Sequence, residues 1–198
     1  MNLKTSTKTL ALIIIFSALA IALNLYGPKI PFPLADFLYF QIWEIPIVVA
    51  FLLIGPKTGL AVAGLNTIVL FMFFQGGLPA GPIYNLTAAL AMMLGIYLPY
   101  KLATWNKKEN KTNYLKKHIL IITLAATALG AILRVAVMSV VNYFALPQSP
   151  PFGYELGEPV VMALIPVIAI FNAIIAAYTI PVSMAVTAAI ENRVKVKN

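Results

Sequence analysis

Three polar residues interrupt long apolar segments in the C-terminal half of the chain. Arg134 and Asn142 lie in "GAILRVAVMSVVNYFALP", residues 130–147, and Asn172 lies in "AIFNAIIAAYTI", residues 169–180. A guanidinium group and two carboxamides are costly in apolar surroundings unless they form hydrogen bonds. These residue types therefore predict either bonds between buried helices or a site that recognises the polar edge of a ligand.

The composition identifies the medium in which these residues lie. Of 198 residues, 61% are hydrophobic and only 10% are charged, and the mean hydropathy is +0.91. Such values indicate an integral membrane protein. Long apolar runs, rather than short alternating segments, predict an all-α polytopic fold, because a helix satisfies its own backbone hydrogen bonds in lipid.

Proline, glycine and charged residues divide the chain into six predicted transmembrane helices within a single domain that covers residues 1–198. The second helix is short for a span and requires tilt or a locally thinner bilayer. The connections 27–41 and 147–158 are rich in proline and aromatic residues, which predicts ordered caps rather than linkers. The predicted helices are residues 9–26, 42–55, 58–75, 82–103, 118–146 and 159–190.

The basic residues set the orientation of these helices. The net charge is +8, yet if the N-terminus is cytoplasmic every basic residue except Lys29 and Arg134 falls at or beyond the cytoplasmic helix ends. The positive-inside rule then predicts six helices with both termini in the cytoplasm, in a multi-pass protein of the cell membrane. The charge thus reflects topology, and we expect no nucleic-acid partner.

Polar residues within the helices are unevenly distributed in depth. At ~1.5 Å per residue, Asn66, Arg134 and Asn172 lie near the middle of the bilayer. Four others lie in its outer half: Asn24, Glu44, Asn85 and Asn142. This asymmetry predicts a pocket that opens outward and is closed below, rather than a channel.

The role of each buried polar residue is open at this level. Arg134 must face the protein interior, where it either caps carbonyls of a neighbouring helix or reaches toward a ligand. Asn142 and Asn172 either join helices by hydrogen bonds or contact the ligand.

Aromatic residues collect on the same outer side. Residues of this type are typical of membrane interfaces, but here they coincide with Gln41, Glu44, Asn85 and Asn142. Rings and amides together suit a planar heteroaromatic ligand. The aromatic candidates are Tyr39, Phe40, Trp43, Tyr84 and Tyr143.

The first helix carries a different feature, Ala18 and Ala22, four residues apart on one face. This small-xxx-small pattern permits close approach of another helix, either within the protein or from a partner subunit. The sequence contains no Walker A, H-E-x-x-H or G-x-S-x-G motif and no cysteine. We therefore expect no enzymatic activity, no metal site and no ATP hydrolysis by this chain itself.

These residues carry a resemblance to a known family. The alanine face of the first helix, "WEIPIVVAFLLIGPKTGLAVAGL" at 43–65 and "GPIYNLTAALAMMLGIYLP" at 81–99 resemble the substrate-binding S component of an energy-coupling factor (ECF) vitamin transporter. Within that family, "MSVVNYFALP" at 138–147 and "IFNAII" at 170–175 are most similar to the riboflavin-specific branch.

The resemblance implies a function and a set of partners. Such proteins bind a vitamin in the outer half of the membrane, and a transmembrane T subunit and two cytoplasmic ATPases drive its release. It implies that Asn142 and Asn172 bind the flavin ring and that Ala18 and Ala22 meet the T subunit. The chain departs from the branch at Ile170, a proline there, and at Ile175, commonly a lysine, which leaves Arg134 as a donor from the fifth helix.

Three alternatives stay open. The ligand of an S component can be another vitamin or heteroaromatic precursor. A stand-alone secondary transporter typically shows repeated halves with broken helices, which this sequence does not display. A membrane enzyme of lipid chemistry needs acids or histidines near the cytoplasmic face, where this chain offers lysines and Glu109.

Overall fold

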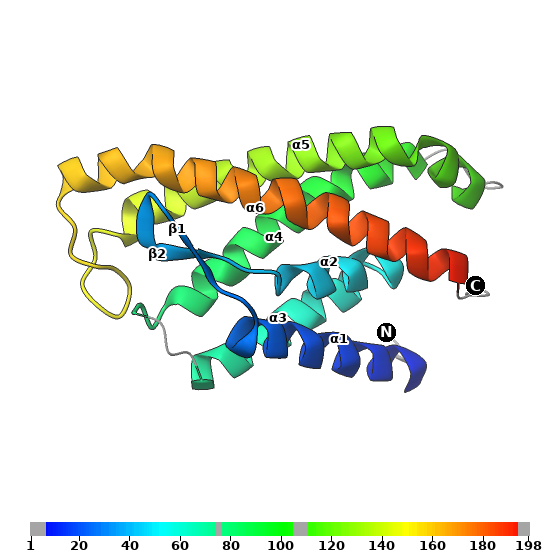
Figure 1. Cartoon of the computed structure of the whole chain (residues 1–198), viewed down its shortest axis with the longest axis horizontal. Helices are drawn as coiled ribbons and strands as arrows, with labels where there is room; N and C mark the ends of the chain where they lie inside the picture. The colour runs from blue at the N-terminus through cyan, green and yellow to red at the C-terminus, as the bar shows by residue number, and fades with distance from the viewer. Residues whose placement is uncertain (1–6, 74–76, 105–110, 194–198) are drawn as a thin grey trace, which may run out of the picture. The chain divides into compact units, whose positions relative to one another are not determined.

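The computed structural model describes residues 7–73, 77–104 and 111–193, which form six helices and two short strands (Figure 1). Five of the helices are long and apolar enough to cross a membrane. The elements in chain order are α1 Thr7–Tyr26, β1 Ile30–Phe32, β2 Ala35–Phe40, α2 Glu44–Leu53, α3 Pro56–Phe73, α4 Gly81–Thr104, α5 Lys111–Ala145 and α6 Glu158–Arg193.

The helix boundaries follow those predicted from the sequence within a few residues, except at the start of α5. This helix begins at Lys111, but His118 has non-helical dihedrals of φ −112° and ψ 15°. The predicted span therefore starts at a kink inside α5, and about two helical turns precede it. The basic content of that preceding segment explains why hydropathy did not include it.

The short helix α2 and the turn after it have clear local causes. Gly55 has a φ of 137°, which a residue with a side chain rarely adopts, and it ends α2 with a bond from its N–H to the carbonyl of Ala50. Pro56 then occupies the first position of α3, where the missing N–H costs nothing. With 10 residues α2 is about 15 Å long, half of a bilayer core, and it is largely buried.

The connection between α1 and α2 is a β-hairpin, which the sequence analysis did not predict. β1 and β2 pair antiparallel, with Ile30 opposite Phe40 and Pro31 opposite Tyr39. The rings of Phe32 and Phe40 meet edge to face, with centroids 5.4 Å apart. The expectation of an ordered cap at 27–41 is correct, but three prolines in this stretch concealed the strands.

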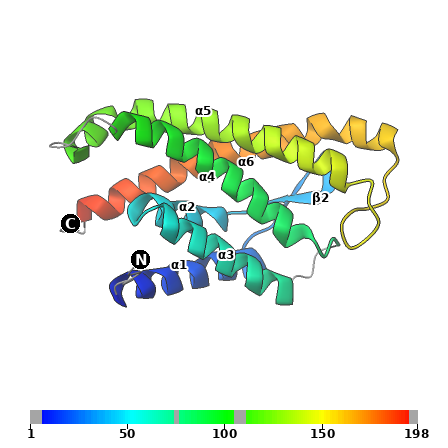
Figure 2. The same cartoon turned by 180° about the vertical axis from the view of Figure 1, so that it is seen from behind.

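The chain divides into two compact units. The first comprises Met1–Leu86 and Val182–Asn198, and the second comprises Thr87–Pro181, so α4 and α6 each contribute to both. In the first unit, α1 packs on α2 and α3, and the Ser183 hydroxyl donates to the carbonyl of Ile45 at 3.4 Å. Figures 1 and 2 show the start of α1, the α2–α3 turn and the end of α6 at one end of this unit and the hairpin at the other.

The second unit contains α5 with parts of α4 and α6. Gly95 of α4 lies directly against the backbone of Gly130 in α5, and Gly130 in turn faces the side chain of Ile180 in α6. This approach requires glycine at position 95, because a Cβ atom there would meet the backbone of α5, whereas a Cβ atom at Gly130 would meet the end of the Ile180 side chain in α6. This contact sets the spacing of the three helices around the polar residues described next.

Candidate functional site

The centre of the second unit holds a buried polar pair, Arg134 and Asn172. Arg134 is 4% exposed and Asn172 is 3% exposed. The Nε–H of Arg134 donates to Oδ1 of Asn172 at 2.9 Å, and its Nη1 lies 3.8 Å from the sulfur of Met92. The contact agrees with the expectation that Arg134 and Asn172 lie at one level, and the arginine joins α5 to α6 through a side-chain amide. Their depth in the bilayer stays a prediction.

The glycine contact explains how Arg134 reaches this position. Gly130 lies one helical turn before Arg134 on the same face of α5, and Met92 lies almost one turn before Gly95 on α4. Because the two glycines bring α4 and α5 together, the guanidinium is confined between the methionine and the asparagine.

Both candidate asparagines also bond to their own helices. Nδ2 of Asn172 donates to the carbonyl of Ile168 at 2.9 Å, and Nδ2 of Asn142 donates to the carbonyl of Met138 at 2.7 Å. Asn142 is only half-buried, whereas Asn172 is buried. Each Nδ2 group therefore uses one of its two N–H donors within its own helix. The second N–H donor of each side chain can bind a ligand.

The C-terminal end of α5 carries an aromatic pair. The rings of Tyr143 and Phe144 lie 5.2 Å apart at an angle of 81°, and they are 38% and 65% exposed. Exposed rings at a helix end suit either the interface or a ligand plane.

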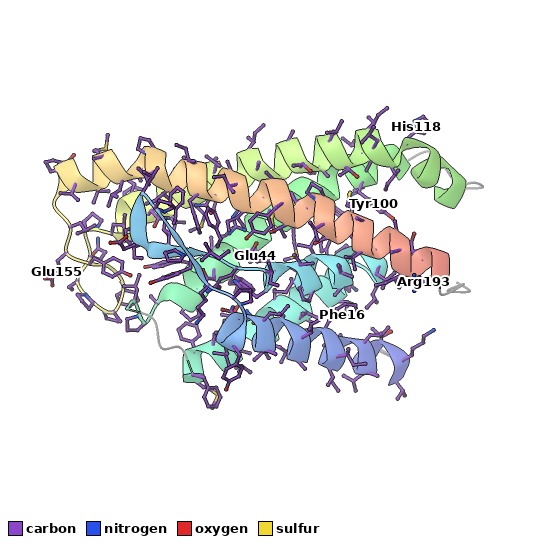
Figure 3. All side chains as sticks on the ribbon, viewed as in Figure 1. Phe16, Glu44, Tyr100, His118, Glu155 and Arg193 are labelled. Carbon is purple, nitrogen blue, oxygen red and sulfur yellow. The ribbon has the colours of Figure 1, made fainter. Side chains whose placement is uncertain are left out.

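The loop after α5, residues 146–157, is held by its own backbone. The N–H groups of Tyr154 and Leu156 both donate to the carbonyl of Leu146, and that of Glu155 donates to the carbonyl of Gln148. Figure 3 shows Glu155 on this loop. Its backbone lies in the left-handed region, with a φ of 55°. These bonds agree with the prediction that residues 147–158 are ordered rather than a linker, and their role as a cap stays a prediction.

Five candidates of the first unit lie at the end of β2 and in the residues just after it. Tyr39 is 43% exposed on the hairpin, and Phe40 and Gln41 are half-buried. Trp43 precedes α2 and is buried, and Glu44 is 4% exposed in the first turn of that helix (Figure 3). A carboxylate there complements the positive end of the helix dipole, which gives Glu44 a structural role independent of a ligand.

Tyr84 and Asn85 also belong to the first unit. Both are half-buried and lie in the first two turns of α4, directly after Gly81. Within the first unit the structure groups Tyr39 to Glu44 along one strand and turn and places Tyr84 beside Asn85 on α4. Within the second unit it groups Arg134 with Asn172 and leaves Asn142 half-buried on α5.

Two members of the polar centre were not predicted from the sequence. Met92 and the carbonyl of Ile168 bind Arg134 and Asn172 respectively. A methionine in an apolar helix gives no sequence signal of such a contact. A backbone carbonyl gives none either, because every residue has one. The shared depth of Arg134 and Asn172 was the one available indication that they meet.

The alanine pair of α1 lies on a surface that the described structure leaves uncovered. Ala18 and Ala22 are exposed, whereas Ser17, Ala20 and Asn24 form the buried face of the helix. Of the five long helices, α1 is the least buried. The small residues are therefore not used to pack α1 within the protein.

Comparison with known proteins identifies the family. The family model described as "ECF transporter, substrate-specific component" matches residues 8–187. The chain is 31% identical over 139 residues to riboflavin transporter RibU of Staphylococcus aureus (strain TCH60), a match that covers 70% of this chain and 65% of that protein. It is 28% identical over 156 residues to riboflavin transporter FmnP of Bacillus subtilis (strain 168), covering 77% and 72% of the two chains.

A solved structure agrees. The S component of a bacterial ECF transporter superposes with a TM-score of 0.69 at 25% identity, covering 94% of this chain and 96% of that one. The matched stretch spans slightly less than two thirds of the Staphylococcus relative but nearly all of the solved chain. The protein, a multi-pass component of the cell membrane, therefore belongs to the substrate-specific components of ECF transporters.

Proposed function

We propose that this chain binds riboflavin for import, with the ligand held in the outer half of the membrane. The observation that carries the proposal is the buried Arg134–Asn172 pair, since a charged side chain at this depth is costly and typically functional. Two relatives named as riboflavin transporters support this choice of ligand.

Within the second unit, Asn172 and Asn142 contact the polar edge of the flavin ring and Tyr143 contacts its face. Arg134 belongs to the site through its bond to Asn172. The candidates of the first unit remain proposals from the sequence, each testable by its own variant: Gln41, Glu44, Asn85, Tyr39, Phe40, Trp43 and Tyr84.

The first experiment is a riboflavin titration of the detergent-purified protein. Stacking and desolvation of the flavin quench its fluorescence, so we expect saturable quenching at near-equimolar protein. Thiamine, a vitamin without an isoalloxazine ring, serves as the competitor control and is expected not to release the flavin. Absence of quenching would refute riboflavin as the ligand, and displacement by another vitamin would identify the alternative.

We also propose that the chain forms one six-helix membrane domain, residues 1–198, with both termini in the cytoplasm and with α2 spanning a locally thinner part of the bilayer. The common end of the start of α1, the α2–α3 turn and the end of α6 supports this orientation (Figures 1 and 2). Lys8, Lys57 and Arg193 lie at these three places and are exposed. Positive charge at this end agrees with a cytoplasmic side.

The exposed face of α1 is proposed to dock on a transmembrane T subunit, which couples the chain to two ATPase subunits. Ala18 and Ala22 let a partner helix approach closely because they carry only a methyl group. Import then requires this contact, whereas ligand binding by the isolated chain does not.

Ala18→Trp is expected to separate these two activities. The indole group prevents close helix contact and weakens T-subunit association by about tenfold or more, with unchanged riboflavin affinity. Riboflavin uptake and co-purification of the T subunit measure the association, and quenching of flavin fluorescence measures the riboflavin affinity. Leu19→Trp, at a neighbouring exposed position that faces about 100° away, is the matched control. Equal uptake by the two variants would place the docking surface elsewhere.

A further inference from the structure

We infer that Arg134 is a positioning residue that fixes the side-chain amide of Asn172 in one orientation, so that the amide meets the ligand as a hydrogen-bond donor. The inference rests on the proposed function, in which Asn172 contacts the ligand. It assigns to Arg134 a part in ligand specificity through Asn172 rather than by its own contact.

The bonds of Asn172 define the orientation. Its Oδ1 accepts from Nε of Arg134 at 2.9 Å, and its Nδ2 donates to the carbonyl of Ile168 at 2.9 Å. Rotation of the amide by 180° would place N–H groups against the N–H of arginine and an oxygen against a carbonyl oxygen. Two buried hydrogen bonds would become two repulsive contacts. Water cannot reach these groups to replace the lost bonds, because the side chain is only 3% exposed.

This locked orientation leaves a defined surface for the ligand. One oxygen lone pair is engaged by the cation and one N–H by the helix, so the second N–H of Nδ2 is the donor that remains. The bond from the guanidinium also polarises the amide and strengthens that donor. The complementary ligand group is an acceptor, such as a ring carbonyl oxygen or an unprotonated ring nitrogen.

Arg134 is itself held for this task. Its Nη1 lies 3.8 Å from the Met92 sulfur, and Gly130, one turn away, lies directly against Gly95 of α4. The arginine cannot withdraw to solvent at 4% exposure, so the bond to Asn172 persists in the ligand-free protein. The amide is thus oriented before the ligand arrives, which lowers the entropic cost of binding.

A pair of variants of equal length tests the inference. In Arg134→Gln, the amide nitrogen occupies the chain position of Nε and can still donate to Asn172, whereas Arg134→Met fills the same length without a donor. Both remove the charge. We expect the Gln variant to keep riboflavin affinity within about threefold and the Met variant to lose about tenfold or more.

The selectivity of binding provides a readout that a purely structural role does not change. The probe is a riboflavin analogue with an amino group in place of a pyrimidine carbonyl. The ratio of the affinities for riboflavin and the analogue should be high in the original protein and in Arg134→Gln, and should fall in Arg134→Met. Equal affinities and ratios in the two variants overturn the inference, and would instead indicate direct contact of the lost guanidinium with the ligand.

A second variant covers the case in which Arg134→Met does not fold. Asn172→Asp retains an oxygen for the Nε–H of Arg134 but has no N–H to offer, so riboflavin binding should be lost in a folded protein. Retained binding contradicts the inference. Failure of the unmodified protein to bind riboflavin would instead refute the proposed function, so the two failures are distinguishable.

Discussion

Asn172→Ala is expected to lower the affinity for riboflavin about 10- to 100-fold and also to lower the thermal stability of the ligand-free protein. The substitution removes the proposed ligand donor, and it leaves the buried Nε–H of Arg134 without its acceptor. An unsatisfied buried polar group costs about 1–3 kcal/mol, more when charged, and 1.4 kcal/mol corresponds to a tenfold change. Fluorescence titration and thermal unfolding in detergent measure the two effects.

Thr179→Val is the matched control for this experiment. Thr179 lies two turns after Asn172 on α6 and is fully buried, and its Oγ1 has no hydrogen-bond partner among the residues that the structure describes. Replacing an unpartnered hydroxyl by an isosteric methyl group is expected to leave both binding and stability unchanged or slightly improved. If the two variants lose stability equally, the loss of any buried polar group from α6 would explain the effect. The Arg134–Asn172 bond would then not be its cause.

The comparison of these two residues shows what the sequence alone could establish. Hydropathy located every long helix, because a transmembrane segment requires a continuous apolar run. Depth counted from the helix ends then placed Arg134 and Asn172 at one level, and the structure joins them. Rotation about the helix axis was the missing quantity, since nearly every face of these helices is apolar and no periodicity indicates which residue faces which neighbour.

The hairpin was missed for a related reason. Residues 27–41 contain three prolines, which argue against strands, yet the pairing avoids the difficulty by lasting only a few residues and by shifting register between Pro31 and Phe32. The aromatic residues that the sequence indicated at Tyr39 and Phe40 thus lie on a strand rather than in an irregular loop. Their chemistry was predictable, but the alternation that turns Tyr39 outward and packs Phe40 on Phe32 was not.

Gly95→Ala is expected to cause a large loss of stability in the second unit, because the added methyl group meets the backbone of another helix. A Cβ atom at this position would lie 2.6 Å from the nitrogen of Gly130 and 2.7 Å from the carbonyl oxygen of Leu129. Both are backbone atoms, so α4 and α5 must separate to admit it. Overpacking costs about 1–3 kcal/mol where side chains can adjust, and a rigid backbone obstacle places this variant at or above the upper limit.

Two other glycines calibrate this result. At Gly130 an added Cβ would meet the end of the flexible Ile180 side chain at 2.5 Å, so Gly130→Ala should destabilise less than Gly95→Ala. At Gly64, in α3, nothing lies within 4 Å, and alanine should be neutral or stabilise the helix by about 0.5–1 kcal/mol. Unfolding temperatures in detergent should therefore rise in the order Gly95→Ala, Gly130→Ala, Gly64→Ala.

Because separation of α4 from α5 also removes Met92 from Arg134, riboflavin affinity should fall in Gly95→Ala and not in Gly64→Ala. Loss of stability without loss of affinity in Gly95→Ala would show that the glycine contact holds the helices together but does not position the arginine.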